Sequence, residues 1–389
     1  MKNIAYIILT GIVLGCVSCK DQDSIYEEFL VPNGIVYPMP AQKAVAKPGN
    51  KRIEISWQNG VDPKVTKANI FWDNYTKSVE IDITPDMEIV SRIIDPIEEN
   101  TYSFMIHTYD MDGNVSVPIE VMGKVYGDKY KNSLNNRVLM SGIWDVDLLL
   151  NWFVADKTEV GVNVYYTDMS GAPKTRFVEP TETKTLITDF KLGTPLYYST
   201  VFKPDTMAID EFSASNADIS YWAYIADQVM KGNPWAPYRT TGSNLGNGLY
   251  AAADWIANAE AAKGGNVDTG YGTTLAFYTY AGYPSTTMTN GKLYQIVELE
   301  AGTYRFSAHP YTFWGSPAKM YVTASLGDEL ADVDNVETEA LGFARITNQR
   351  VYSFEFDVPE YGPVALGFVG SLSGNQYTLW SEVQLWRKF

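Results

Sequence analysis

The stretch RIEISW, residues 52–57, decides the fold of the first part of the chain. Its apolar residues Ile53, Ile55 and Trp57 alternate with polar ones, which is the period of a strand that buries one face. The run Asp-Gly-Asn at 112–114 is a turn of the kind that joins adjacent antiparallel strands. Further alternating segments lie at 66–72, 78–83 and 100–107. This part of the chain therefore predicts an antiparallel β-domain.

The same pattern occurs a second time, farther along the chain. Trp152 ends the segment 147–152 as Trp57 ends the first strand. The spacing from Trp152 to Tyr197 is 45 residues, and the spacing from Trp57 to Tyr102 is also 45. Two copies at one spacing predict two domains of one type. Their length, with no cysteine inside them, is typical of seven-stranded β-sandwiches.

These positions resemble fibronectin type III domains. The two tryptophans occupy the place of that family's core tryptophan on the second strand, and the two tyrosines occupy the place of its tyrosine corner. The resemblance covers residues 37–126 and, more weakly, residues 137–214. It implies two modules that act as spacers or binding scaffolds.

The last part of the chain, residues 221–389, is rich in Gly, Thr and aromatic residues. Segments 291–299 and 303–308 alternate around the turn 300–302 and predict a β-hairpin. The segment 221–230 fits either a short helix or a strand. Further strands are expected at 319–326, 349–357, 364–369 and 378–386. Strands at this spacing predict a second kind of sandwich, a jelly roll, so the expected fold class is all-β.

The phrase NGKLYQIVELEAGTYRFSAH, residues 290–309, and the closing LWSEVQLW, residues 379–386, resemble the galactose-binding-like jelly roll of carbohydrate-binding modules. The whole arrangement resembles Bacteroidetes-type surface lipoproteins that accompany glycan-uptake systems. The motifs that carry this resemblance are structural, so it implies function only by association.

The N-terminus has the features of a secretory signal peptide. Lys2 precedes the apolar run 4–14, and small residues follow. This run is shorter than the roughly 20 residues that span a bilayer, so it predicts a cleaved signal over residues 1–19 and no membrane helix.

A cysteine after small residues resembles the lipobox of bacterial lipoproteins. We expect lipid attachment at Cys19, with Cys16 as the alternative. The residues 20–23, Lys-Asp-Gln-Asp, resemble the acidic export tag of surface lipoproteins and favour Cys19. Residues 20–36 are then a tether, and the expected location is the outer membrane, exposed at the cell surface. An ordinary secretion signal that leaves with both cysteines is the other interpretation.

Composition restricts the partners. The net charge of -16 argues against nucleic acid and against electrostatic docking on anionic lipid, whereas neutral glycans fit it. The sequence has no H-E-x-x-H, P-loop or G-x-S-x-G motif, and His107 and His309 belong to different expected domains. We therefore expect no enzyme, although the sequence contains enough Asp and Glu residues to supply the carboxylate pair of a glycosidase.

Aromatic residues in Gly- and Pro-rich loops of the last domain suggest a sugar-binding surface. Aromatic faces pack against sugar C–H groups, while polar side chains at the rim bind hydroxyls. The candidate ligand-binding residues are Trp235, Arg239, Trp255, His309, Tyr311 and Trp314, with Tyr238, Asn244, Tyr271 and Tyr283 in similar contexts. The alternative is that these rings fill the ends of the sandwich.

An acidic loop supplies the candidate metal ligands Asp328, Asp332 and Asp334. Carboxylate oxygens suit Ca²⁺, so this loop is either a structural calcium site or a solvated acidic loop. The sequence as a whole predicts a lipid-anchored envelope protein that displays a carbohydrate-binding jelly roll for glycan capture. The alternatives are a structural lipoprotein that binds another envelope protein and, less favoured, a glycoside-acting enzyme.

Overall fold

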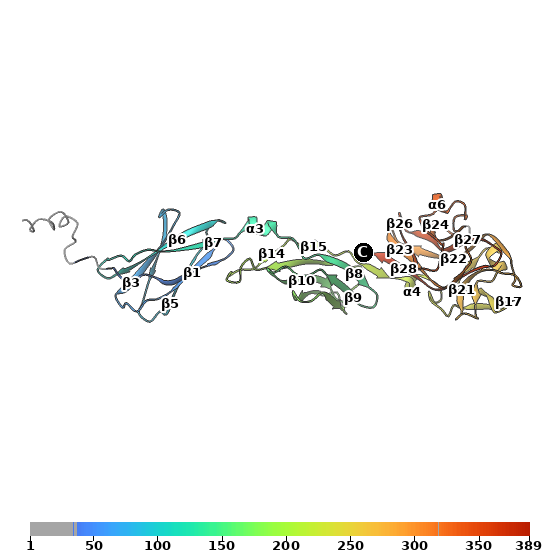
Figure 1. Ribbon diagram of the computed structural model, residues 1–389, viewed down its shortest axis with the longest axis horizontal. Coiled ribbons are helices and arrows are strands. Elements are labelled where there is room, and N and C mark those ends of the chain that lie inside the picture. The colour runs from blue at the N-terminus through green and yellow to red at the C-terminus, as the bar shows by residue number, and fades with distance from the viewer. Residues whose placement is uncertain (1–33, 35–36, 318) are drawn as a thin grey trace, which may run out of the picture. The chain divides into compact units, whose positions relative to one another are not determined.

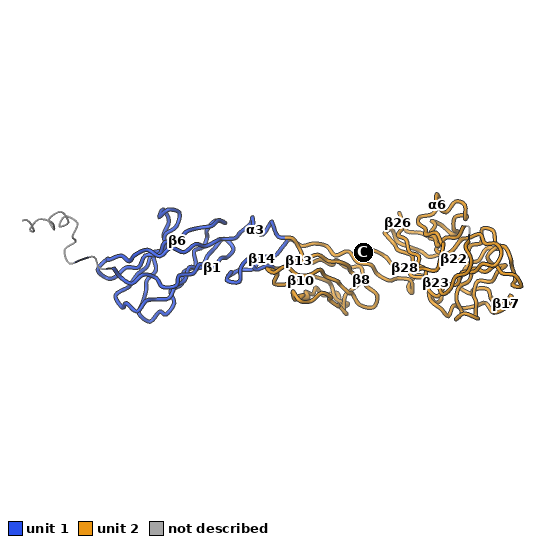
Figure 2. The backbone as a smooth tube through the Cα atoms, viewed as in Figure 1, with its two compact units in different colours: residues 1–134, 202–214 blue, residues 135–201, 215–389 orange. Residues whose placement is uncertain are grey.

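The computed structural model describes residues 34, 37–317 and 319–389. Cys16, Cys19 and the expected signal peptide lie outside the described residues. The described part is built almost entirely of strands, which confirms the predicted all-β class (Figure 1). Its contacts divide the chain into unit 1, Met1–Leu134 with Phe202–Ala214, and unit 2, Asn135–Val201 with Ser215–Phe389 (Figure 2).

Unit 1 contains a sandwich of seven antiparallel strands. One sheet has the order β1-β2-β5 and the other the order β4-β3-β6-β7. The elements are β1 (Gln42–Pro48), β2 (Ile53–Gln58), β3 (Val65–Trp72), β4 (Lys77–Asp82), β5 (Ile89–Ile94), β6 (Thr101–Asp110), β7 (Ile119–Lys124) and the short helix α3 (Asp128–Ser133). The apolar residues of the RIEISW segment are buried in its core, as predicted.

The tyrosine corner expected in unit 1 is present. The Tyr102 hydroxyl donates a hydrogen bond of 2.9 Å to the carbonyl oxygen of Glu98, four residues upstream. This bond fixes the entry into β6, which is the role of the corner in fibronectin-like sandwiches. The predicted turn at 112–114 joins β6 to β7, and Gly113 adopts a φ of 83° there.

A segment distant in sequence completes unit 1. Within residues 202–214, which include β14 (Phe212–Ser213), the Ile209 amide donates to the carbonyl of Pro48 at 2.8 Å. The Arg52 Nε donates to Asp210 Oδ2 at 2.8 Å. The sequence-defined segment 137–214 therefore contributes to both units.

The first part of unit 2 is a second small sandwich. One sheet is formed by β12, β9 and β8, and the other by β11, β10, β13 and β15. Their bounds are β8 (Leu139–Trp144), β9 (Leu148–Trp152), β10 (Glu159–Thr167), β11 (Pro173–Val178), β12 (Lys184–Ile187), β13 (Tyr197–Phe202) and β15 (Ala217–Asp218). Trp152 is buried as predicted, and its indole N–H donates to Thr185 Oγ1 at 3.0 Å.

The expected tyrosine corner of this second sandwich differs from the prediction. Tyr197 stacks on Tyr165, with 5.0 Å between the ring centroids. The neighbouring Tyr198 is buried instead, and its hydroxyl donates to the carbonyl of Arg137 at 2.9 Å. The interval of 45 residues therefore identifies the strand correctly but assigns the inward position to the wrong one of two adjacent tyrosines.

The second sandwich shares a sheet with the last domain. Strand β8 pairs in parallel with β16 (Trp222–Tyr224), and β16 pairs antiparallel with β28 (Gln376–Lys388). The segment 221–230 contains both of its expected alternatives, since β16 is followed by the helix α4 (Ala226–Val229). One sheet therefore runs from the second sandwich into the C-terminal jelly roll.

The jelly roll consists of two facing sheets. One contains β26, β23, β28, β21, β20, β18 and β17, and the other has the order β19-β22-β27-β24-β25. The bounds are β17 (Thr240–Gly246), β18 (Leu249–Ala252), β19 (Ile256–Ala257), α5 (Ala259–Lys263), β20 (Val267–Asp268), β21 (Thr274–Thr279), β22 (Thr287–Leu299), β23 (Gly302–Trp314), β24 (Lys319–Leu326), α6 (Val336–Glu339), β25 (Gly342–Arg345), β26 (Tyr352–Val358) and β27 (Gly362–Ser373). No helix in the described ranges is long and apolar enough to span a membrane.

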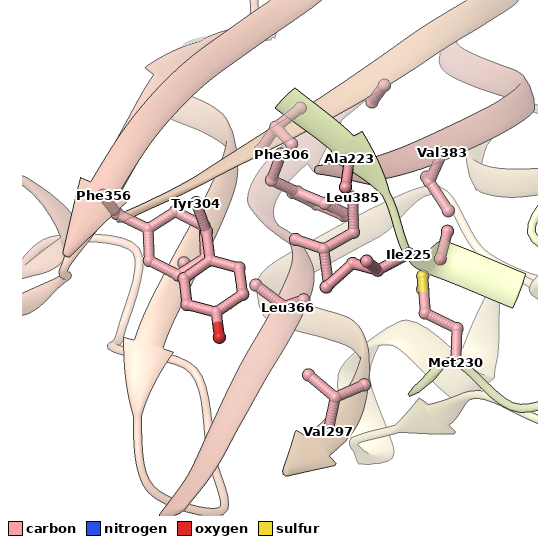
Figure 3. Packing of buried hydrophobic residues seen from close by; sticks show 14 of the residues in the cluster. Ala223, Ile225, Met230, Val297, Tyr304, Phe306, Phe356, Leu366, Val383 and Leu385 are labelled. Atoms are coloured by element: carbon pink, nitrogen blue, oxygen red, sulfur yellow. The ribbon is translucent and has the colours of Figure 1, made fainter. Parts of the chain in front are cut away.

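The core between these sheets also contains residues from the segment that comes before the jelly roll in the sequence. Figure 3 shows Ala223 and Ile225 beside Leu385 and Val383, which come from β28. This single apolar cluster extends from Leu148 of the second sandwich to Leu385. Packing therefore couples the two parts of unit 2.

The predicted hairpin at 291–308 is wrong. Strand β22 pairs with β19 and β27, whereas β23 pairs with β26 and β28, so the turn carries the chain from one sheet to the other. The Tyr304 hydroxyl donates to the Glu300 carbonyl at 2.8 Å and fixes this crossing. Alternation gave the strands but not their partners, because it reports which face is buried and not which edge is paired.

Candidate functional site

Strand β21 separates the core from an outward face of the jelly roll. Its residues Leu275 and Phe277 belong to the main core. The residues between and after them, Ala276 and Tyr278, belong to a small separate cluster with Leu379 of β28. Successive side chains of a strand point to opposite sides, so this cluster lies on the side away from the core. We refer to this side of β21, β28 and β23 as the outer face.

A row of three aromatic residues crosses the outer face. Tyr278 of β21 is paired with Tyr377 of β28, and Tyr377 is paired with Trp314 of β23. Residues directly opposite each other in antiparallel strands share a face. The rings of Tyr278 and Tyr377 are stacked with 5.0 Å between centroids, and Trp314 is 59% exposed. We refer to these three residues as the aromatic row.

Further tyrosines surround the aromatic row. Tyr283 stacks on Tyr278 with 4.8 Å between ring centroids. Exposed Tyr271 and Tyr311 form an edge-to-face pair with centroids 6.3 Å apart. Burial raises the pKa of Tyr377, and the nearby phenol of Tyr271 raises it further. The Tyr377 phenol therefore stays protonated at neutral pH and can donate a hydrogen bond.

A row of polar groups lies farther along β28. Glu382 of β28 is paired on one side with His309 of β23 and on the other with Trp235. The His309 Nδ1 lies 3.9 Å from Glu382 Oε2, and Gln384 Nε2 donates to Glu382 Oε1 at 2.7 Å. We refer to Trp235, Glu382 and His309 as the polar row. It places hydrogen-bonding groups next to one exposed indole.

A buried carboxyl group lies near the tyrosines. Asp268 of β20 is almost fully buried and accepts a hydrogen bond of 2.8 Å from the Gly270 amide. Burial raises the pKa of Asp268, and its charge is among the causes that raise the pKa of Tyr278. The group therefore adds to the field that keeps the phenols neutral.

The structure brings several predicted site residues together. Trp235 and His309 meet in the polar row, and Trp314 lies in the aromatic row. Tyr311 is exposed beside Tyr271. The expected loop at this point is wrong, because His309, Tyr311 and Trp314 all lie within strand β23. Arg239 belongs to neither row and forms an ion pair with Asp254 at 3.4 Å.

Trp255 requires a correction. It is only 7% exposed and packs against Tyr238 and Phe368 with ring centroids 6.4 and 6.1 Å away. Tyr238 is buried as well, and its hydroxyl donates to the Pro234 carbonyl at 2.8 Å. Both rings therefore fill the sandwich core and do not face a ligand. Gly- and Pro-rich flanks mark a loop but do not show on which side of it a ring lies.

The acidic loop is organised around a lysine. The Lys292 ammonium, whose side chain is 5% exposed, lies 2.7 Å from Asp332 and 2.8 Å from Glu329. Asp334 pairs with Lys319, and Asp328 is exposed. Among the residues that the structure describes, no group of three His, Cys, Asp or Glu side chains is arranged to hold a metal ion. The predicted calcium ligands therefore do not converge.

Sequence reasoning missed the residues of β28. Glu382 lies in the expected strand 378–386 and Tyr377 directly before it, and alternation alone marks neither as a site residue. The available signal was that aromatic residues occupy both alternating sets of QYTLWSEVQLWRK, residues 376–388. An irregularity in the pairing of β23 with β28, between His309 and Thr312, changes which set faces outward. Trp380 packs in the core on one side of it and Val383 and Leu385 on the other, so Tyr377 and Glu382 both face outward although they belong to different sets.

Two protein-family models match parts of the chain. A domain of unknown function, DUF4998, matches residues 19–212, and a second one, DUF5013, matches residues 231–367. No curated protein sequence matches the chain. By fold and by site, the chain is an all-β protein of sandwich domains that exposes an aromatic sheet face.

Two solved structures are similar to parts of the chain. One is a two-domain fibronectin type III segment of chicken tenascin, with 12% identity and a TM-score of 0.21, over 46% of this chain and 97% of that one. The other is TmCBM61 in complex with β-1,4-galactotriose, with 15% identity and a TM-score of 0.23, over 38% of this chain and 99% of that one. Because both TM-scores are low, the fold described above rests on strand pairing and not on these likenesses.

Proposed function

We propose that the outer face of the jelly roll binds a carbohydrate. The observation that carries this proposal is the aromatic row, in which Trp314 is 59% exposed and is paired with Tyr377, whose ring stacks on Tyr278. Strand register places the three residues on one face of the sheet. An aromatic surface that the strands already present needs little rearrangement when a ligand binds.

The chemistry of the face suits a sugar. Exposed rings of Trp235, Tyr311 and Trp314 offer apolar surfaces to sugar C–H groups. Glu382 and His309 offer an acceptor and a polar ring nitrogen to hydroxyl groups. Each stacking contact contributes about 1 kcal/mol beyond area burial, so several rings are needed to reach micromolar affinity.

The wider role follows from the N-terminal resemblance. In this proposal the chain is anchored by lipid at Cys19, or at Cys16, in the outer membrane of a bacterial envelope. The fibronectin-like domains hold the jelly roll away from the membrane for glycan capture. The protein binds its ligand without turning it over.

Affinity electrophoresis tests the proposed binding. Residues 20–389 are run through gels that contain plant, host or microbial polysaccharides, beside the variant Trp314→Ala. We expect one class of polysaccharide to retard the wild type and to retard the variant much less. If no polysaccharide retards the wild type, the carbohydrate proposal fails, and a search for an envelope protein partner becomes the better course.

Tyr361→Ala is the matched control for this experiment. Tyr361 is exposed on the turn between β26 and β27 and lies outside both rows. We expect this variant to be retarded as strongly as the wild type. Equal losses in Trp314→Ala and Tyr361→Ala would show a nonspecific effect of surface aromatics and would contradict the site.

A further inference from the structure

A groove lies at the other end of β28, where the second sandwich joins the jelly roll within unit 2. It encloses a volume of about 460 Å³ and opens on both β8 and β28. This size falls in the range of about 300–1,000 Å³ that is typical of small-ligand sites. Its lining residues are Met140, Ser141, Gly142, Ile143, Ser220, Trp222, Arg305, Trp386 and Lys388.

Strand register places the aromatic and cationic residues on one face. Trp222 of β16 is paired with Lys388 of β28, and Arg305 of β23 is paired with Trp386. The row continues onto the second sandwich, because Trp222 is also paired in parallel with Ile143 of β8. The groove therefore exists only because the two parts of unit 2 share a sheet.

The Arg305 guanidinium is fixed in the groove. Its carbon lies 4.2 Å from the centroid of the Trp222 ring, and its Nη2 donates to Glu355 Oε1 at 2.8 Å. A cation over an indole face and an ion pair together restrict the side chain. Glu355 lies outside the groove lining, on the neighbouring strand β26, where it is paired with Arg305.

The second cation of the groove is Lys388. The Lys388 ammonium lies 5.9 Å from the centroid of the same Trp222 ring. In the described part of the chain Lys388 takes part in no ion pair, and no acidic residue lines the groove. Because Arg305 already pairs with Glu355, Lys388 is the groove cation that has no carboxylate partner among the described residues, in a chain whose net charge is -16.

We propose that this groove binds a saccharide that carries a carboxylate, such as a uronic acid residue. The indoles of Trp222 and Trp386 would pack against the sugar ring, while Arg305 and Lys388 would pair with the carboxylate. A planar guanidinium matches the two oxygens of a carboxylate. This second site goes beyond the carbohydrate-binding surface proposed above, and it is formed by different side chains.

Isothermal titration of residues 20–389 with tri-galacturonate, and with a glucuronate-containing disaccharide, tests the proposal. The fully methyl-esterified trisaccharide is the uncharged control. We expect at least one acidic sugar to bind, the ester to bind about tenfold more weakly, and added salt to weaken the acidic sugar only. Absence of binding by both acidic sugars, or equal binding of acid and ester, would overturn the proposal.

Two variants locate the binding. Lys388→Gln removes the free cation, and we expect about a tenfold loss of affinity for the acidic sugar at an unchanged melting temperature. Lys157→Gln, an exposed lysine of unit 2 that does not line the groove, should bind like the wild type. Equal affinity in Lys388→Gln and wild type would refute the site. Loss of neutral-glycan retardation in Trp314→Ala, with acidic binding retained, would show that the two sites are independent.

Discussion

Single residues with the same sequence context have different roles in this protein. Trp255 and Trp314 both stand in loop-like stretches near glycines, but one is 7% exposed and the other 59%. The structure exposes Trp235, Tyr311 and Trp314, but Tyr311 and Trp314 lie in strand β23 and not in the loop that the sequence predicts. The sequence context does not separate them from the buried Trp255, because the burial of a ring depends on strands that are distant in sequence.

Alanine substitutions at the two tryptophans should therefore differ strongly in their effect on the free energy of unfolding. Trp255→Ala leaves a cavity beside Phe368, and we expect it to lower the free energy of unfolding by about 3–5 kcal/mol. Trp314→Ala should change it by no more than about 0.5 kcal/mol, because the ring is exposed. Urea unfolding measures both values. A large loss in Trp314→Ala would assign that residue to the core.

The acidic loop provides a second test at this scale. We propose that Lys292, and not calcium, holds Asp332 and Glu329. Lys292→Met should lower the free energy of unfolding at neutral pH by about 0.5–1 kcal/mol, a value reduced because solvent screens the exposed carboxylates. The melting temperature of the wild type should be the same in EDTA and in calcium. A calcium-dependent rise in melting temperature would contradict this interpretation.

The pH dependence of the same interaction has a defined sign. The hydrogen bond from Lys292 lowers the pKa of Asp332 below its ordinary value of 3.8. Burial alone would lower the pKa of Lys292, but its bonds to Asp332 and Glu329 outweigh burial and raise it above 10.5. The stability difference between wild type and Lys292→Met should therefore be present between these values. It should shrink as pH falls below 3.8 or rises above 10.5.

Strands, in contrast to single loop residues, were largely predictable. The expected segment 319–326 coincides with β24, and 378–386 lies within β28. Alternation reveals such strands because burial on one face imposes a period of two. Their partners were not predictable, and the incorrect hairpin at 291–308 shows why. A short turn with glycine serves equally for a hairpin and for a crossing between two sheets.

The crossing from β22 to β23 can be tested by removing one hydroxyl. Tyr304→Phe deletes the bond from the Tyr304 hydroxyl to the Glu300 carbonyl and keeps the buried ring. We expect a loss of about 1 kcal/mol in the free energy of unfolding. Tyr361→Phe, at an exposed position, should cost nothing measurable in the same denaturation experiment. Equal stability of both variants would mean that the hydroxyl does not stabilise the crossing.

The whole molecule is divided differently from the sequence repeats. The repeated spacing of tryptophan and tyrosine identified two related sandwiches. It gave no indication that β8 of the second one pairs with β16, because parallel pairing between distant segments leaves no local signal. The same pairing creates the groove that Trp222 and Arg305 line, and no sequence motif indicated this groove.

This division predicts the unfolding behaviour. Leu150 and Leu366 belong to one apolar cluster, whereas Ile55 belongs to a separate one in unit 1. In differential scanning calorimetry, Leu150→Ala and Leu366→Ala should lower the same transition, and Ile55→Ala should lower another. Each truncation should cost about 2–5 kcal/mol. A third transition that responds to Leu150→Ala alone would contradict the shared core.

The central claim is that the outer face of the jelly roll binds a sugar. The most direct measurement is the dissociation constant of residues 20–389 for an oligosaccharide of the retained polysaccharide, compared with that of the double variant Trp235→Ala/Trp314→Ala. We predict a dissociation constant at least about tenfold higher in the double variant, at an unchanged melting temperature. Equal constants in a folded double variant would contradict the claim and place the ligand elsewhere on the protein.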